Sequence, residues 1–167
     1  LWAAQLEHPF VVELAEGRLD EAAFECWLRQ DYRYLLDYAR VMALAGAKAR
    51  TETRMTDLLG MAHATLSTEM DLHREFAADY GISREDLEAT EKAPTCEAYT
   101  AFLLRTAYGG SLAEIAAALY PCGQGFLDVG ERAVELATGE HRYTPWIETY
   151  TSEEFRDVVD RLRAFVD

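Results

Sequence analysis

An aspartate stands on the apolar face of a predicted helix near the start of the chain. Asp31 lies at helical spacing between two pairs of large apolar or aromatic residues, so its carboxylate should point toward the core. Those pairs are Trp27 with Leu28 and Tyr34 with Leu35. A buried carboxylate needs hydrogen-bonding or cationic partners, because otherwise its pKa rises and it becomes neutral. Asp31 is therefore either a structural link to an arginine or a tyrosine, or part of a functional site.

A glutamate and a histidine repeat this pattern further along the chain. Glu69 shares a line with Ala62, Leu66, Leu72 and Phe76, and His73 follows one turn later. The pair could bind a metal, but di-iron sites in helical bundles use a Glu-x-x-His spacing that is contributed twice. Only one acid–histidine pair is evident here, and its spacing differs. We therefore favour a hydrogen-bonded role for Glu69 and His73, and we expect neither a metal nor a cofactor.

A cysteine directly follows a proline in a later helix. Cys122 continues the apolar stripe formed by Leu112, Ile115, Leu119, Phe126 and Val129, so its thiol should face the interior. A buried cysteine is usually only a small hydrophobic residue. Pro121, however, leaves the carbonyl of Ala117 without its helical partner and predicts an interruption of the helix, a feature often found at functional positions. Both an inert and a reactive thiol remain open.

Aromatic residues could supply the walls of a pocket for a flat polar ring. Tyrosine offers a face for stacking and a hydroxyl for hydrogen bonding, although a single buried aromatic residue more often belongs to the core. The candidates are Tyr32, Tyr34, Tyr38, Tyr99 and Tyr150, and we add Phe126 as a substrate-binding candidate.

The elements that must position these residues are all helical. Every long segment has helical periodicity, and the chain has no alternating β-branched run that would indicate a sheet. We predict a short helix before Pro9, a turn over 17–20, helices over 21–49, 52–80 and 94–109, a helix from 111 to 138 interrupted at Pro121, a turn over 145–150, and a last helix capped by Thr151. Ser83 with Asp86 resembles a capping pair, and Ser111 with Glu114 forms a capping box.

The charge is strongly acidic. The 167 residues include 30 acidic and 16 basic ones, giving a formal net charge of −14. Such a field repels phosphate backbones and anionic lipids, so we expect no nucleic-acid partner. Because only Lys48 and Lys92 are lysines and strong salt screens self-repulsion, we hypothesise a halophilic source; an ordinary acidic protein is the alternative.

The three cysteines and the hydropathy indicate the compartment. The chain has an odd number of cysteines without CxxC spacing, a pattern typical of reduced thiols; they are Cys26, Cys96 and Cys122. No apolar stretch reaches the roughly 20 residues of a membrane span, and the first residues do not form a signal sequence. We expect a cytoplasmic protein without a membrane partner.

Seven short segments together resemble the TenA (thiaminase II) family. They are 7–11 (EHPFV), 28–32 (LRQDY), 69–76 (EMDLHREF), 94–95 (PT), 99–100 (YT), 121–122 (PC) and 146–150 (WIETY), in the same order and spacing. Their joint occurrence across the chain is quite specific. The resemblance implies an all-α, heme-oxygenase-like helical bundle that usually assembles as a homotetramer.

The resemblance also implies an activity. In the cysteine-bearing branch of the family the thiol after the proline is the nucleophile, and Cys122 stands in its place. The helix-borne aspartate that binds the aminopyrimidine matches Asp31, and the pocket tyrosines match Tyr34, Tyr99 and Tyr150. The implied catalytic residues are Cys122, Asp31 and Tyr150, supported by Glu69 and His73. The implied reaction converts aminomethylpyrimidine, and possibly thiamine, to hydroxymethylpyrimidine for thiamine salvage.

The chain departs from the family pattern at its end. The family carries a catalytic glutamate on a final helix beyond the matched region, so we expect residues 1–167 to form a single TenA-like domain without the C-terminal helices. Glu69 is then an alternative acid for protonating the ring. Two other readings remain: a non-catalytic pyrimidine-binding helical protein, and a heme or di-iron protein on the same fold.

Overall fold

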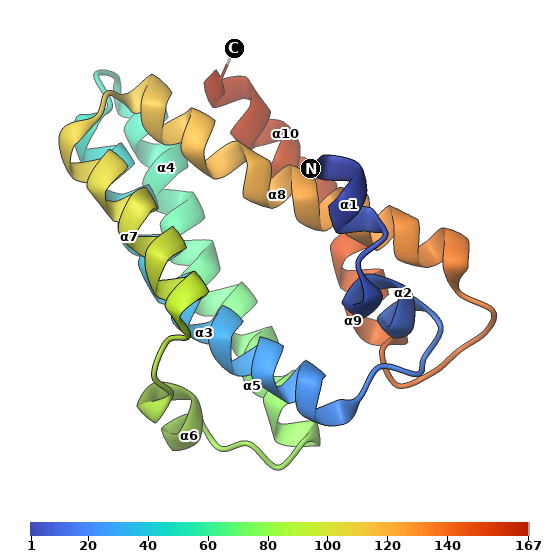
Figure 1. The fold of residues 1–167 in the computed structure, drawn as a ribbon. Helices are drawn as coiled ribbons and strands as arrows, with labels where there is room; N and C mark the ends of the chain where they lie inside the picture. The colour runs from blue at the N-terminus through green and yellow to red at the C-terminus, as the bar shows by residue number, and fades with distance from the viewer. Residues whose placement is uncertain (167) are drawn as a thin grey trace. The chain divides into compact units, whose positions relative to one another are not determined.

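The computed structural model describes residues 1–166, and every regular element in that range is helical (Figure 1). The helices are α1 (Trp2–Leu6), α2 (Pro9–Ala15), α3 (Glu21–Lys48), α4 (Glu52–Ala64), α5 (Met70–Asp79), α6 (Arg84–Ala89), α7 (Pro94–Gly109), α8 (Leu112–Leu136), α9 (Thr144–Thr151) and α10 (Glu153–Val166), with a π-helical turn η1 (Thr65–Glu69) between α4 and α5. The predicted all-α class is confirmed. The sequence did not separate α2 from the short first helix.

The longest described helix, α3, carries Asp31 and Tyr34. Asp20 Oδ1 accepts a hydrogen bond from the Ala22 backbone N–H at 2.9 Å, which satisfies a donor that a helix start leaves unpaired. Glu21 in the first turn and Lys48 in the last both suit the helix dipole. Its buried stripe includes Phe24, Leu28, Asp31, Tyr34, Leu35, Tyr38, Val41 and Met42, which confirms that Asp31 lies on the inner face.

The segment predicted as one helix over 52–80 contains a π-helical turn. Thr51 caps its start by accepting from the Arg54 N–H at 3.3 Å. Within and beside η1, the hydroxyls of Thr65 and Ser67 donate to carbonyls one turn earlier, at Met61 (3.1 Å) and His63 (2.8 Å). Such back-bonding competes with the regular ladder, and π turns of this kind are frequent at functional sites. Glu69 is the last residue of this turn.

The helix of Cys122 continues through Pro121, so the predicted interruption is wrong. A proline removes one backbone donor, and the long apolar face of α8 holds the helix together around that loss. A second finding concerns Gly123: a Cβ built there would lie 2.9 Å from Leu162 Cδ1 of α10. Glycine at position 123 therefore leaves room for Leu162 of α10 to pack against α8.

The segment around Pro145 is also helical, so the predicted turn over 145–150 is wrong. Pro145 lies in the first turn of α9, where its missing N–H costs nothing. The predicted cap Thr151 is instead the last residue of α9, and its hydroxyl donates to the Ile147 carbonyl at 2.8 Å. Ser152 caps α10, since its Oγ accepts from the Phe155 N–H at 3.1 Å.

The described residues group into two compact units. Unit 1 combines residues 1–23 with those from 119 onward, and unit 2 comprises residues 24–118. In unit 2, α3 contacts α5 through Asp31 and His73 and contacts α7 through Tyr34 and Tyr99, and α4 runs on into α5 through η1 (Figure 1). The single domain stays a prediction.

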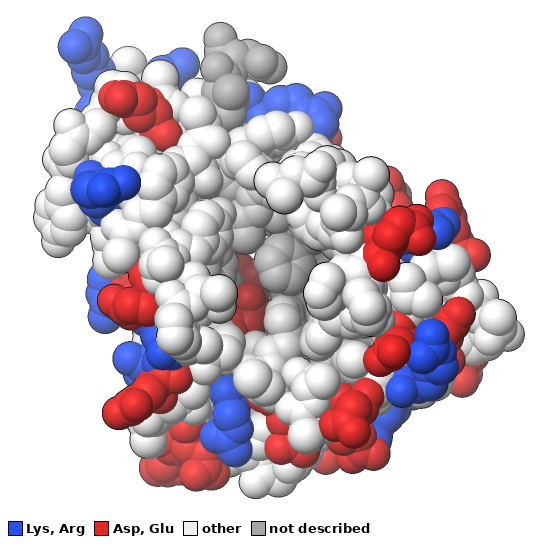
Figure 2. Space-filling view, viewed as in Figure 1, with Lys and Arg blue, Asp and Glu red and all other residues white. Residues whose placement is uncertain are grey.

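The surface carries both signs of charge. Figure 2 shows acidic and basic side chains intermixed on the viewed face, with broad areas that carry neither. Several basic side chains are engaged by carboxylates, among them Arg18, Arg84, Arg132 and Arg156. The halophilic source stays a prediction. Among the described residues, no helix combines the length and apolar character that crossing a membrane requires.

Candidate functional site

The buried carboxylate of Asp31 has a histidine partner on the facing helix. His73 Nε2 lies 2.6 Å from Asp31 Oδ2, and the two residues are only 1% and 8% exposed. His73 Nδ1 lies 2.9 Å from the backbone carbonyl oxygen of Glu69. A carbonyl can only accept, so Nδ1 carries a proton and donates it. This bond fixes the orientation of the imidazole toward Asp31.

Glu69 brings a second carboxyl group close to the pair. Burial raises the pKa of Glu69 to about 7; the positive charge of His73 opposes that rise and the negative charge of Asp31 adds to it. Near neutral pH the Glu69 side chain is therefore divided between acid and carboxylate. A carboxyl group that titrates in this range can donate or accept a proton during catalysis.

Aromatic rings border the pair. The Trp27 ring lies 5.8 Å from the His73 ring, measured between centroids. One turn beyond Asp31, Tyr34 stacks on Tyr99 of α7 with centroids 5.8 Å apart and planes within 5° of parallel. Tyr34 is 7% exposed, whereas Tyr99 is 37% exposed. The structure thus brings Tyr99 of α7 against Tyr34 of α3, two residues that the sequence placed on separate helices.

A polar clamp that the sequence analysis missed positions α7 against α3. The Gln30 side-chain amide donates to the Glu91 carbonyl at 3.0 Å and accepts from the Ala93 N–H at 2.7 Å. The Gln30 side chain therefore satisfies two backbone groups of the segment just before α7, which have no helical partner there. Cys96 Sγ donates to the Gln30 carbonyl at 3.6 Å. The sequence offers one signal for this contact, which is a polar residue directly before an acid that is predicted to be buried.

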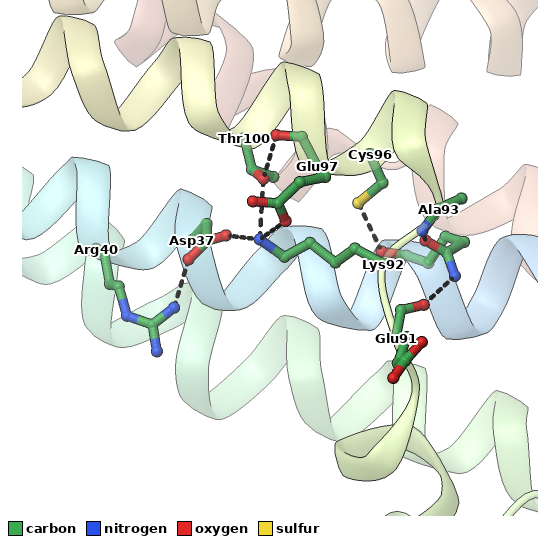
Figure 3. Close-up of polar contacts among 9 residues, drawn as sticks. Asp37, Arg40, Glu91, Lys92, Ala93, Cys96, Glu97 and Thr100 are labelled. Carbon is green, nitrogen blue, oxygen red and sulfur yellow. Dashed lines mark hydrogen bonds and ion pairs between the residues drawn. The ribbon is translucent and has the colours of Figure 1, made fainter.

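Lys92 forms the second half of this clamp, which Figure 3 shows. Its ammonium pairs with the buried Asp37 and donates to Thr100 Oγ1 at 2.9 Å, and Glu97 lies 3.3 Å away. Burial alone would raise the pKa of Asp37, but hydrogen bonds from Lys92 and Arg40 outweigh it and lower that pKa. Asp37 is therefore held as a carboxylate. The scarcity of lysine was the only sequence signal.

Replacing Lys92 by methionine should lower the free energy of unfolding by about 3 kcal/mol, because it leaves Asp37 buried without its main partner. Urea denaturation measures the loss, and adding Asp37→Asn should recover much of it. Arg84→Met is the matched control: it breaks the exposed Arg84–Glu88 pair, which water screens, and should lower the free energy of unfolding far less. Equal losses in both variants would contradict the role of burial.

The thiol candidate belongs to unit 1, beside an aromatic cluster. Cys122 is half-buried, and Phe126 follows it on the same face of α8. Phe126 stacks on Tyr150 of α9 at 4.8 Å between centroids. Trp146 and Phe155 complete the cluster around the Tyr150 ring, at 4.7 and 5.0 Å. None of the three cysteines forms a disulfide.

Possible metal ligands were compared across the described part of the chain. No group of three or more His, Cys, Asp or Glu side chains in residues 1–166 is arranged to hold a metal ion. The Asp31–His73 pair is joined directly by a hydrogen bond instead.

The fold belongs to the heme oxygenase-like class. A domain with that fold from Shewanella denitrificans OS217 superposes with a TM-score of 0.75 over 99% of this chain and 73% of its own, at 18% identity. The predicted fold is confirmed.

The chain belongs to the TENA/THI-4/PQQC family, whose model matches residues 1–167. An aminopyrimidine aminohydrolase from Halalkalibacterium halodurans is 40% identical over 169 residues, covering 100% of this chain and 75% of the relative. A TenA family transcription regulator from Silicibacter sp. TM1040 superposes with a TM-score of 0.93 at 36% identity, covering 99% of this chain and 73% of that one. The resemblance drawn from the seven segments is confirmed.

Proposed function

We propose that this protein hydrolyses an aminopyrimidine, converting aminomethylpyrimidine to hydroxymethylpyrimidine and ammonia. The observation that carries the proposal is the buried Asp31 carboxylate, held by His73 beside the stacked Tyr34 and Tyr99. A flat ring rich in N–H groups matches such a site, because the carboxylate accepts hydrogen bonds and the tyrosines offer a face and hydroxyls. The aminohydrolase relatives agree with this choice of substrate.

The covalent step is assigned to Cys122. Its thiolate adds to a ring carbon while a ring nitrogen takes up a proton, and ammonia then leaves the attached methylene. Water adds to that methylene, and the carbon–sulfur bond breaks to release the thiolate. The sum is one aminomethyl group and one water giving one hydroxymethyl group and one ammonia. Splitting a difficult displacement in this way is the benefit of nucleophilic catalysis.

Tyr150 and Phe126 are the proposed companions of that thiol. Phe126 lies on the same face of α8 as Cys122, and Tyr150 stacks on Phe126. A tyrosine hydroxyl can donate a hydrogen bond to a thiolate and lower the pKa of the thiol. In this proposal Tyr150 assists the nucleophile and Phe126 contacts the substrate.

Glu69 is the proposed acid that protonates the ring. A general acid works best when its pKa lies near the operating pH, and burial raises the pKa of Glu69 to about 7. The hydrogen bond from His73 to the Glu69 carbonyl ties this residue to the Asp31 pair.

We also propose that the protein forms homotetramers in the cytoplasm. Large apolar side chains remain exposed on α4 and α7, namely Met55, Leu59, Phe102 and Tyr108. Exposed apolar side chains that form a contiguous patch mark surfaces that bind another protein chain. Sedimentation analysis at several salt concentrations tests this assembly.

The test of the function is ammonia release from aminomethylpyrimidine in strong salt, with hydroxymethylpyrimidine measured in parallel. We expect equal amounts of the two products, and thiamine is offered separately as a competing substrate. Binding of the pyrimidine without ammonia release would support the non-catalytic alternative. A visible absorption band in the purified protein would instead support a heme or iron protein.

A further inference from the structure

One stripe of α3 faces α7. Gln30, Tyr34 and Asp37 follow one another at helical spacing, so they share one face of α3. Gln30 bonds to the backbone just before α7, and Asp37 pairs with Lys92. Between these two polar contacts, Tyr34 stacks on Tyr99 of α7. The stacked rings are therefore bracketed on both sides by contacts that hold the same two helices together.

The side chain of Lys92 reaches from the start of α7 to the level of Tyr99. Its extended chain carries the ammonium to Asp37 of α3 and to the Thr100 hydroxyl, which accepts a hydrogen bond at 2.9 Å (Figure 3). Thr100 is 0% exposed and directly follows Tyr99. The buried contact tolerates little displacement, because separating the partners would leave the Asp37 carboxylate uncompensated. Lys92 thus fastens α3 to the residue beside Tyr99.

The other lysine of the chain joins the far end of the same two helices. Lys48, in the last turn of α3, donates to the carbonyls of Tyr108 at 3.0 Å and Gly110 at 2.6 Å. Tyr108 lies roughly 14 Å beyond Tyr99 along the helix axis, at about 1.5 Å per residue. Both lysines therefore fasten α7 to α3, and Lys92 is the one that does so beside Tyr99.

Tyr99 combines a held ring with an accessible surface. Its plane lies within 5° of that of Tyr34, and Tyr99 is 37% exposed whereas Tyr34 is 7% exposed. An aromatic ring that is already held in place can stack on a ligand without losing further side-chain entropy. The affinity of such a stacking surface then depends on the contacts that hold it.

We propose that Lys92 is a positioning residue that holds Tyr99 against Tyr34 and thereby sets how tightly the site binds a flat heterocyclic ring. The inference rests on the proposed function and gives the buried Lys92–Asp37 ion pair a role in it. Lys92 acts through Tyr99, since its own contacts are with α3 and α7. Stacking contributes alike to the bound substrate and to the transition state, so displacing Tyr99 should raise KM and leave kcat nearly unchanged.

The first test loosens this contact without leaving a buried charge. Lys92→Met combined with Asp37→Asn removes the ion pair, and calorimetry measures the Kd of hydroxymethylpyrimidine. We expect the Kd to rise about tenfold, the order of affinity that stacking on an aromatic ring supplies. The KM of aminomethylpyrimidine should rise in parallel, with kcat within about twofold. Lys92→Gln with Asp37→Asn repeats the test if the first combination does not fold.

Lys48→Met is the matched control, because it releases the far end of α7 and should leave the Kd unchanged. A double-mutant cycle then asks whether Lys92 acts through Tyr99. Tyr99→Ala should itself weaken binding, and adding the Lys92→Met and Asp37→Asn changes should weaken it little further. Additive losses, an unchanged Kd in the Lys92 variant, or an equal loss in Lys48→Met would each overturn the inference.

The ligand-free protein separates this inference from the proposed function. NMR contacts between the ring protons of Tyr34 and Tyr99 should weaken when Lys92→Met and Asp37→Asn are combined, and persist in Lys48→Met. Ring contacts that persist in both variants would overturn the inference whatever the activity. A natural protein that shows the expected ring contacts and binding but releases no ammonia would instead contradict the proposed function and leave the role of Lys92 standing.

Discussion

Replacing Cys122 by alanine should lower the rate of ammonia release by at least about 1,000-fold, because the covalent route then has no nucleophile. The helical fold should survive, since alanine is a good helix former and Cys122 is only half-buried in α8. Binding of hydroxymethylpyrimidine should remain within a few-fold of the natural protein. Single-turnover measurements and calorimetry check the two halves of this expectation.

The control for this variant is another cysteine of the same chain. Cys26 is exposed on α3, and Cys26→Ala should leave the rate of ammonia release unchanged. If Cys122→Ala kept even a tenth of the natural rate, the nucleophile would have to be sought elsewhere. Loss of both turnover and folding would be recognised by circular dichroism, and Cys122→Ser would then repeat the test.

Most helices could be predicted because their ends carry local signals. Ser83 with Asp86 and Ser111 with Glu114 form the expected capping contacts, and Pro94 begins α7. The wrong predictions concern prolines, because a proline can either interrupt a helix or be tolerated within one. Pro121 alone predicts an interruption, whereas the continuous apolar face of α8 overrides a single missing backbone donor. The π turn has no comparable composition signal.

The candidate site could be predicted only in part, for a physical reason. Helical periodicity shows that Asp31 is buried and therefore needs a partner, but the partner lies 42 residues away. Several polar residues on other helices could have filled that role, and only packing selects His73. The Gln30 and Lys92 contacts were missed for the same reason, since both reach segments more than 50 residues distant or bond to backbone atoms.

Glu69→Gln should lower kcat by about 100-fold and remove a loss of activity near pH 7, because the amide cannot donate the proton that the ring needs. Burial raises the pKa of Glu69 to about 7, so the acid form falls as pH rises through 7. The same shift affects stability. A carboxyl group whose pKa is higher in the folded state stabilises the fold below its unfolded pKa, and this contribution is lost as pH rises through about 7. The variant should therefore lose less stability between pH 5 and 8 than the natural protein.

Glu75→Gln is the control, because Glu75 lies on the exposed face of α5 in the same part of the chain. It should change neither the pH profile of kcat nor the pH dependence of the unfolding free energy. An activity loss in Glu69→Gln with an unaltered pH profile would contradict the proton-donor role, since a side chain that only packs would not remove a titration. A KM effect without a kcat effect would likewise assign Glu69 to binding, because proton transfer to the ring belongs to the transition state.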